Sequence, residues 1–288
     1  MFWEKVFNAG HAPLFGLMSL VVLGVSLTLR PSPPALHVRH YVFAFGVSLL
    51  AGVVTEVFQW IGQIRFGELG DVLVNGVGSS AFLAVAATFD PEMVRLYRLP
   101  RHRLAVLAVS AIVMGIVFVP VPIAVAAEKV RDAAFPRLNG FETYWDLHFL
   151  RTTPYTEIRL APAPDGRDAP LTEVTFHPAR AAIVVLRDPY PDWTGYDRLV
   201  LELYSPSTHA VVLGMKIDDL DDAHMVRAVF SREFVVQPGD NRIAVPLSEI
   251  RDAPRDREMD LTHITGLALY TLDAERSFSL YLDELRLE

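Results

Sequence analysis

Four long apolar runs constrain this chain more than any other feature of its sequence. Ala12 to Leu29 and Val72 to Phe89 each hold 18 residues without a charge, and Leu104 to Ala127 holds 24. A fourth run, Tyr41 to Ile64, is interrupted only by Glu56. Because about 20 apolar residues of helix cross a bilayer core, the sequence predicts four transmembrane helices.

The apolar character ends abruptly at Ala127. With 51% hydrophobic residues, the chain has more apolar sequence than one soluble core needs. Past Ala127 no long apolar run recurs, and short alternating segments with frequent Pro, Gly and Asp take over. We therefore predict a transmembrane domain over residues 1–127 and an exported β-sandwich over 128–288, with its core at about 171–288.

Charge divides at the same place. Residues 1–127 carry eight basic and six acidic residues, whereas the remainder carries 18 basic and 28 acidic ones. An acidic C-terminal domain excludes nucleic acid as an expected partner, since nucleic-acid binding needs a basic face. The chain has no cysteine, which excludes thiol chemistry.

Arginine placement predicts the orientation of the four helices. The connections after the first and third apolar runs contain the arginines Arg30, Arg39, Arg95, Arg98, Arg101 and Arg103. By the positive-inside rule both connections face the cytoplasm. The four helices then have the lipid bilayer as their partner, and the N-terminus, the second connection and everything after Ala127 lie on its outer side.

In two alternatives to this arrangement, the first or the fourth apolar run belongs to a signal peptide that is cleaved off. The first apolar run lacks a basic leader and a small-residue cleavage site. Ala124-Val125-Ala126, at the end of the fourth run, does resemble a cleavage site, but the preceding apolar stretch is longer than a signal peptide needs. We therefore expect both apolar runs to remain in the protein as transmembrane helices. Pro120 and Pro122 are expected to bend or fray the fourth helix.

Polar residues interrupt the second and third runs in a regular pattern. Glu56 and Gln59 are three residues apart, and Asp71 and Asn75 are four apart, so each pair shares one helix face. Gly78 extends the second of these faces by a turn. Ionisable side chains at membrane depth are costly and mark functional sites by default.

Further polar residues are expected near the same outer surface. Arg65 and Glu68 lie in the short connection between the two helices, and His11 begins the first apolar run. We therefore predict a polar outer site built from three helices. A structural alternative stays open, in which Glu56, Arg65 and Asp71 form an ion-pair network that pins the helical hairpin.

The order of these residues resembles a known family. The pattern Glu56-x2-Gln59-x5-Arg65-x5-Asp71-x3-Asn75-x2-Gly78, with "NAGHAPLFGLMSL" in the first helix, is similar to the signature of VanZ-like membrane proteins. The resemblance covers residues 1 to about 90, extending at most to 127. In this chain Phe82 stands where a second glycine of the signature is expected.

This resemblance implies a compartment more firmly than a reaction. VanZ-like proteins are linked to low-level resistance to the glycopeptide teicoplanin and to functions of the cell envelope. The expected localisation is therefore the bacterial inner (cytoplasmic) membrane, with several spans and an extracytoplasmic C-terminal domain.

The C-terminal region has the pattern of an all-β domain. Segments such as "RLVLELYS" and "NRIAVPL" alternate apolar and polar residues, and turn sequences such as "SPST" and "QPGDN" separate them. This predicts an antiparallel sandwich. "DWTGYDRLVLELYSP" and "LYLDELRLE" resemble the jelly-roll domains of the galactose-binding-like superfamily, which includes carbohydrate-binding modules; the match covers Leu171 to Glu288.

Glycan binding is a possible role for such a sandwich. Aromatic rings stack on sugar faces, so Trp145, Tyr190, Trp193 and Tyr204 are candidates. An aromatic residue such as Trp193 also commonly plugs a sandwich core. The run "DDLDDAH" lacks the spacing of a calcium loop and predicts a solvated acidic turn, so we expect no metal site.

The sequence leaves three functions open. We favour an envelope protein that recognises an envelope glycan or glycolipid through its sandwich and polar outer site. An alternative is a membrane-surface enzyme acting on a lipid-linked envelope intermediate, with Glu56 or Asp71 as general acid or base and His11 as a proton relay. A protein-binding scaffold is the third. The predicted binding residues are Gln59, Arg65, Asn75, Gly78, Trp145 and Trp193. No cofactor-binding motif occurs.

Overall fold

The computed structural model divides the chain into two compact units, Met1–Val125 and Ala126–Glu288. The division falls two residues before the boundary predicted from composition. Backbone alone is described at residues 2–4, 59, 60 and 69. The structure describes residues 2–29, 33, 36–61, 69–97, 102–164, 169–220 and 229–288.

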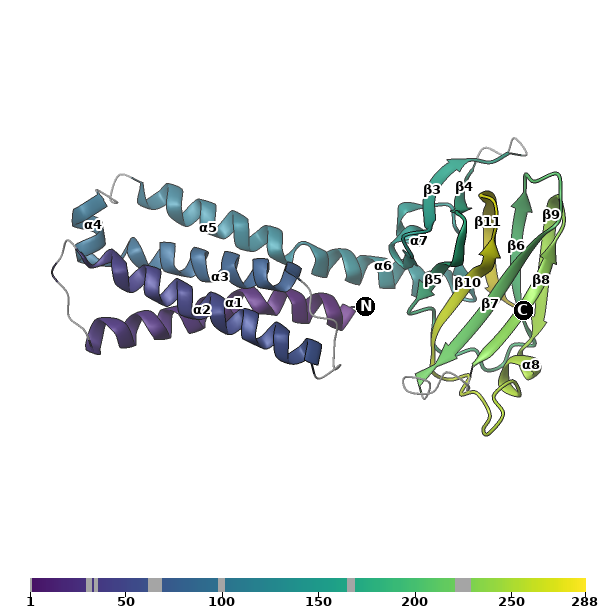
Figure 1. The fold of residues 1–288 in the computed structure, drawn as a ribbon, viewed down its shortest axis with the longest axis horizontal. Helices are drawn as coiled ribbons and strands as arrows, with labels where there is room; N and C mark the ends of the chain where they lie inside the picture. Colours follow the sequence, from purple (N-terminus) through teal and green to yellow (C-terminus); the bar gives the residue numbers. More distant parts are fainter. Residues whose placement is uncertain are drawn as a thin grey trace. The chain divides into compact units, whose positions relative to one another are not determined.

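The first unit is helical (Figure 1). Its long helices coincide with the four predicted apolar runs, and each has a segment long and apolar enough to cross a membrane. A short helix, α4, was not predicted. The helices are α1 (Phe2–Leu29), α2 (Val38–Ile61), α3 (Leu69–Ala87), α4 (Pro91–Tyr97), α5 (Arg103–Phe118) and the beginning of α6 (Pro120–Ala134).

The fourth apolar run is divided into two helices. α5 ends at Phe118 and α6 begins at Pro120, so the interruption falls where the prolines predicted a bend. Proline has no backbone N–H to continue the helical hydrogen bonds. The N–H of Val119 still bonds to the carbonyls of Gly115 and Ile116, which closes the last turn of α5.

Close packing of α1 against α3 organises the helical unit. A Cβ on Gly78 would overlap the backbone of Ala12, so this position must be glycine for the helices to approach so closely. One turn further along, the ring of Phe82 fills the space beside Gly16. The glycine expected at position 82 is thus replaced by an aromatic ring on α3 facing a glycine on α1.

The second unit is an antiparallel β-sandwich, which confirms the predicted fold of this region. In the described residues one sheet has the order β3-β4-β11-β6-β9, with β1 also paired to β11. We call it sheet A. Its strands are β1 (Arg137–Asn139), β3 (Thr156–Pro162), β4 (Pro170–Phe176), β6 (Arg198–Ser205), β9 (Gly239–Pro246) and β11 (Phe278–Leu287).

The other sheet, sheet B, has the order β2-β5-β10-β7-β8. Its strands are β2 (Leu150–Thr152), β5 (Ala179–Arg187), β7 (Val211–Asp219), β8 (Phe230–Val236) and β10 (Ile264–Ala274). Two short helices complete the unit, α7 (Tyr144–His148) and α8 (Leu247–Arg251). The stretch from Pro136 to Leu160 contributes β1, α7, β2 and part of β3.

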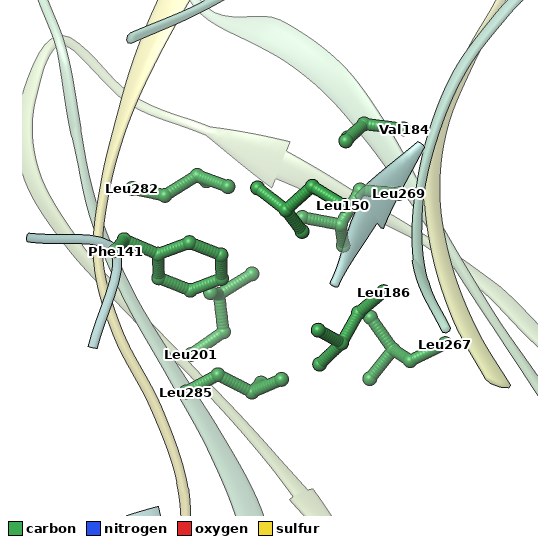
Figure 2. Close-up of a pocket in the computed structure, with 9 residues that line it drawn as sticks. All are labelled: Phe141, Leu150, Val184, Leu186, Leu201, Leu267, Leu269, Leu282 and Leu285. Carbon is green, nitrogen blue, oxygen red and sulfur yellow. The ribbon is translucent and has the colours of Figure 1, made fainter. Parts of the chain in front are cut away.

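The core lies between the two sheets, as the alternating pattern predicts. Figure 2 shows leucines of sheet A, such as Leu201 and Leu282, facing Leu186 and Leu267 of sheet B, with Phe141 beside the leucines of sheet A. The void among these side chains is only about 10 Å³. That volume holds at most about one water molecule, so this part of the core has no room for a ligand.

Candidate functional site

Three helices carry the described residues of the predicted outer site. His11 lies on α1, Glu56 on α2, and Asp71 and Asn75 on α3. The three residues from α2 and α3 are buried, with 7%, 3% and 1% of their surface exposed. The side chain of Gln59 and all of Arg65 lie outside the described residues, so their predicted roles stay predictions.

His11 and Asn75 make the contact that joins α1 to α3 in this polar cluster. His11 Nδ1 lies 3.1 Å from Asn75 Oδ1. Because an amide oxygen only accepts, Nδ1 is the donor and Nε2 of a neutral ring is left as an acceptor. The ring of His11 also stacks on Phe15, with centroids 6.1 Å apart. The histidine is therefore held in one orientation.

The amide nitrogen of Asn75 packs against α2. A Cβ on Gly52 would come within 2.8 Å of Asn75 Nδ2, so glycine at this position makes room for the amide. Among the described residues Nδ2 has no hydrogen-bond partner, although it is buried. Buried donors are nearly always paired, so this nitrogen is a point at which a bound polar group would be stabilised.

Gly78 has a different role from the one predicted. The backbone of Ala12 occupies the space beside it, so Gly78 offers no surface to a ligand. The next residue, Ser79, is fully buried and donates its hydroxyl hydrogen to the carbonyl of Phe15. Both residues hold α1 and α3 together.

A second polar cluster was missed by the sequence analysis. His37 Nε2 lies 2.8 Å from Asp90 Oδ2, and the Tyr41 hydroxyl donates to the same oxygen at 2.8 Å. Nearby, Ser26 Oγ lies 2.7 Å from His40 Nδ1, and the rings of His37 and His40 meet edge to face. By spacing, one helix face carries His37, His40 and Tyr41. Their partners, Ser26 and Asp90, are remote in sequence.

Asp90 is the centre of this second cluster. Burial opposes its charged form, but the hydrogen bonds from His37 and Tyr41, with that from the Glu92 N–H, together lower its pKa. Its other oxygen, Oδ1, accepts from the backbone N–H groups of Glu92 and Met93. Asp90 therefore caps α4 and ties it to the beginning of α2, which indicates a structural role.

Two of the predicted sugar-binding aromatics differ in exposure. Trp193 is fully buried, and its Nε1 donates to the carbonyl of Tyr190. The prediction that Trp193 binds a ligand is therefore wrong, because its ring packs inside the sandwich. Trp145 lies on α7 with 40% of its surface exposed, so it can still contact a ligand.

The described part of the acidic run, residues 218–220, differs from the predicted solvated turn. Asp219 is buried, and its carboxylate forms two hydrogen bonds of 2.5 Å with Arg257. It is an ion-paired core residue and not a solvated one. Residues 221–224 of the same run lie outside the described residues. Within the described part of the chain, no group of three or more His, Cys, Asp or Glu side chains could hold a metal ion.

Sheet A carries a polar row that crosses five strands on its outer face. Strand register aligns the residues in pairs from β3 to β9. Leu203 and Leu282, which flank the central pair, point into the core, so the row points outward. The row consists of Arg159, Glu173, Tyr281, Tyr204 and Asp240.

Two tyrosines form the centre of this row. The rings of Tyr204 and Tyr281 are 6.4 Å apart and meet edge to face. Burial, and then the nearby Glu173 carboxylate, raise the pKa of Tyr281. Arg159 holds Glu173 by a hydrogen bond of 2.8 Å from Nε. The Tyr281 hydroxyl therefore stays protonated at neutral pH, beside a carboxylate of fixed orientation.

A charged network lies beside the tyrosine pair, most of it on the same two strands. Arg286 bonds to Glu202 at 2.7 Å, and it also pairs with Glu284 and Glu288. The hydrogen bond with Glu202 is the main reason that the pKa of Arg286 is raised. Arg242 adds a second cation on Glu288. The carboxylates are thus fixed in place as hydrogen-bond acceptors.

The outer face of sheet B has a different character. The ring of Tyr270 lies over Gly214, and its hydroxyl is 2.9 Å from Ser231 Oγ. The same face carries the exposed apolar side chains of Val212, Val235 and Leu272. Strand register also places Lys216 and Glu233 on this face, so it mixes apolar and charged groups around its aromatic ring.

Comparison with known proteins gives matches among solved structures only. No family model matches the chain, and no curated protein is similar to it in sequence. An exo-beta-agarase structure matches with a TM-score of 0.44 and 14% identity, covering 53% of this chain but only 25% of the agarase chain. A family 11 carbohydrate-binding module from Clostridium thermocellum, in complex with a beta-1,3-1,4-mixed-linked tetrasaccharide, matches with a TM-score of 0.38 and 13% identity, covering 48% of this chain and 86% of the module.

A family 28 carbohydrate-binding module specific for non-crystalline cellulose is similar as well. It matches with a TM-score of 0.39 and 10% identity, covering 54% of this chain and 94% of the module. At these TM-scores and identities the matches assign neither a family nor a ligand to this chain. With no family model matched, the resemblance to VanZ-like proteins stays a prediction.

Proposed function

We propose that the C-terminal sandwich binds a glycan along the tyrosine row of sheet A. The observation that carries this proposal is the alignment of Tyr281 and Tyr204 between Glu173 on one side and Asp240 on the other. Tyrosine rings provide amphipathic platforms for the apolar faces of sugars. Carboxylates in fixed positions accept hydrogen bonds from sugar hydroxyls.

The dimensions of the row suit a linear oligosaccharide. Neighbouring strands lie about 4.8 Å apart, so a row over five strands is about 19 Å long. A chain of several sugars can therefore lie across the strands and contact every member of the row. Since arginines pair with Glu173 and Glu202, the face is best matched to a neutral, hydroxyl-rich glycan.

Oligosaccharide binding by the full chain tests the proposal. The purified protein is applied to an array of linear oligosaccharides derived from bacterial envelopes and from neutral β-glucans. We expect binding that Tyr204→Ala and Tyr281→Ala each weaken by at least about tenfold, equivalent to 1.4 kcal/mol. The matched control is Tyr155→Ala, because Tyr155 is 52% exposed and lies outside the row.

The outcome that contradicts the proposal is equally specific. Binding that survives both substitutions in the row would place the ligand elsewhere, for example at Trp145. Equal losses in the Tyr155 control would indicate a general effect of removing exposed aromatics. The absence of any binding oligosaccharide would favour a scaffold role.

We also propose that the helical unit spans the cytoplasmic membrane of a bacterium four times. The segments that support this are Lys5–Leu29, Val38–Phe58, Gly70–Ala87 and Arg103–Ala134. Only 6% of the most apolar stretch of the last segment is buried within the protein. Such an apolar and exposed helix needs lipid around it. Arg95 and Arg103 then lie on the cytoplasmic side, and the sandwich lies outside.

Reporter fusions test this topology. A reporter fused after Arg103 and another fused after Glu288 should report opposite compartments. Activity of both reporters in the same compartment would remove the four-span arrangement.

A second function, catalysis on a lipid-linked envelope intermediate, is favoured by one observation. Glu56 on α2 and Asp71 on α3 are both buried. Asn75 lies on α3 too, and its amide oxygen accepts a hydrogen bond from His11. A carboxyl group could act there as general acid or base, with His11 as the relay and Arg65 binding an anionic head group. Turnover of a lipid-linked substrate by the purified chain, lost in Asp71→Asn, would support this function; its absence would leave glycan recognition.

A further inference from the structure

An apolar crevice runs along the helical unit between α1, α3 and α5. Its volume is about 400 Å³, which falls within the range of small-molecule pockets. The lining comes from all three helices and includes Leu20, Phe82, Ala86, Leu107 and Met114. Ser110, on α5, is the polar residue of the lining and is itself 7% exposed. Such a surface suits a hydrocarbon chain.

One face of α5 connects this crevice to a cation. Arg103, Leu107, Ser110 and Met114 follow one another at spacings of four, three and four residues, which places them on one helix face. The guanidinium carbon of Arg103 lies 4.1 Å from the centre of the Phe89 ring, just beyond the end of α3. A cation is thus held at one end of the crevice.

The surroundings of Arg103 favour an anion. Its side chain is exposed, and within the described residues no carboxylate forms an ion pair with it. Arg103 is also the first residue of α5, where the helix dipole adds partial positive charge. A guanidinium binds phosphate through two parallel hydrogen bonds. Basic pockets between transmembrane helices on the cytoplasmic side bind anionic lipid head groups.

We propose that this crevice binds one acyl chain of an anionic phospholipid and that Arg103 holds its phosphate. Four residues of helix from Arg103 to Leu107 span about 6 Å, and eleven to Met114 span about 16 Å. A phosphate and the chain attached to it extend over just such a length. The inference rests on the proposed membrane insertion, and it concerns the cytoplasmic leaflet.

The crevice is separate from the polar cluster around Asn75. On α1, His11 and Leu20 are nine residues apart, which at 100° per residue places them on opposite faces. Between them, the close contact of Gly78 with Ala12 closes the seam of α1 and α3. A lipid in the crevice therefore acts as a structural or regulatory ligand and not as the substrate of the outer site.

Native mass spectrometry of the full chain in detergent tests the proposal. The probes are a phosphatidylglycerol and a phosphatidylcholine with the same acyl chains, together with glycerol phosphate as a head group without chains. Arg103→Gln removes the cation, and its control is Arg39→Gln, at another exposed arginine. Ala111→Phe fills the crevice, and its control is Ile112→Phe, at a 62% exposed position outside the lining.

We expect the wild-type chain to retain phosphatidylglycerol in preference to phosphatidylcholine and to bind no glycerol phosphate. Arg103→Gln should lower phosphatidylglycerol affinity about fivefold, as for one basic residue near an anionic surface, and leave phosphatidylcholine unchanged. Ala111→Phe should remove the tightest lipid of either kind, and both controls should behave as wild type.

Two results would overturn the proposal. Equal retention of the two lipids by the wild-type chain would show general lipid contact only. Binding of glycerol phosphate as tight as that of the lipid would show a site for free phosphate. Because the reporter fusions measure insertion separately, either result in a correctly inserted chain rejects the lipid site and leaves the proposed topology standing.

Discussion

Replacing Arg257 with alanine should destabilise the sandwich strongly. The Asp219 side chain has no exposed surface, and two of its hydrogen bonds, each 2.5 Å long, come from Arg257. Removing one partner of a buried ion pair costs about 3–5 kcal/mol. Since the backbone N–H of Asp260 still donates to Asp219 at 2.7 Å, we expect the lower limit, about 3 kcal/mol.

The expected loss translates into a measurable change in melting temperature. For a domain of this size, each 1 kcal/mol shifts Tm by about 2–4 °C, so Arg257→Ala should lower it by about 6–12 °C. Differential scanning calorimetry of the full chain in detergent follows the transition. The control is Arg255→Ala, at an exposed arginine of the same loop, which should shift Tm by less than about 2 °C.

A second substitution separates loss of packing from the cost of an orphaned charge. Asp219→Asn in the Arg257→Ala background removes the buried charge but keeps an oxygen for the N–H of Asp260. Part of the lost stability should return, because an uncharged amide is cheaper to bury than a carboxylate. If Arg257→Ala shifts Tm no more than Arg255→Ala, or if the double variant recovers nothing, the carboxylate is not held as described.

The remaining predictions concern helix packing, pH and the polar cluster. Gly78→Ala should reduce the monodisperse protein recovered in detergent, whereas Gly70→Ala, with open space beside it, should not; equal recoveries would refute close packing at position 78. Burial opposes ionisation of Asp219, but hydrogen bonds from Arg257 lower its pKa overall. The stability it contributes should therefore be present at neutral pH and be lost as pH falls below about 4; a melting temperature that is flat down to pH 3 would contradict this. Asp71→Asn should keep the abundance of the protein near wild type while abolishing its function in the cell envelope. Parallel losses of abundance and function would leave only the structural alternative, in which the polar residues pin the helical hairpin.

The architecture follows from the sequence because hydropathy is a local property. Uninterrupted apolar runs predict helices long enough to span a membrane, and period-two alternation predicts a half-buried sheet. Even the interruption at Val119 follows from the covalent chemistry of Pro120. The contact of Asn75 with His11 is harder to predict from the sequence. The two residues are 64 positions apart in the chain, and their contact depends on how two helices pack.

The sites depend on long-range pairing that no local pattern specifies. Tyr281 meets Tyr204 because of strand register across a sheet whose neighbours are not consecutive in sequence. Trp193 illustrates the converse, because an aromatic residue in a turn fits a binding face and a core equally well until its burial is known. Asp90 was overlooked because nothing in its own neighbourhood indicates that His37 is its partner.

Isothermal titration of the full chain with a series of oligosaccharides of increasing length tests glycan recognition most directly. The series is built on the best sugar from the array. If the ligand lies across sheet A, affinity should rise with each added sugar until the oligosaccharide spans the row of about 19 Å and then level off, and Tyr281→Ala should flatten the rise. Affinity that is independent of length, or a rise that persists unchanged in Tyr281→Ala, would contradict binding along this row.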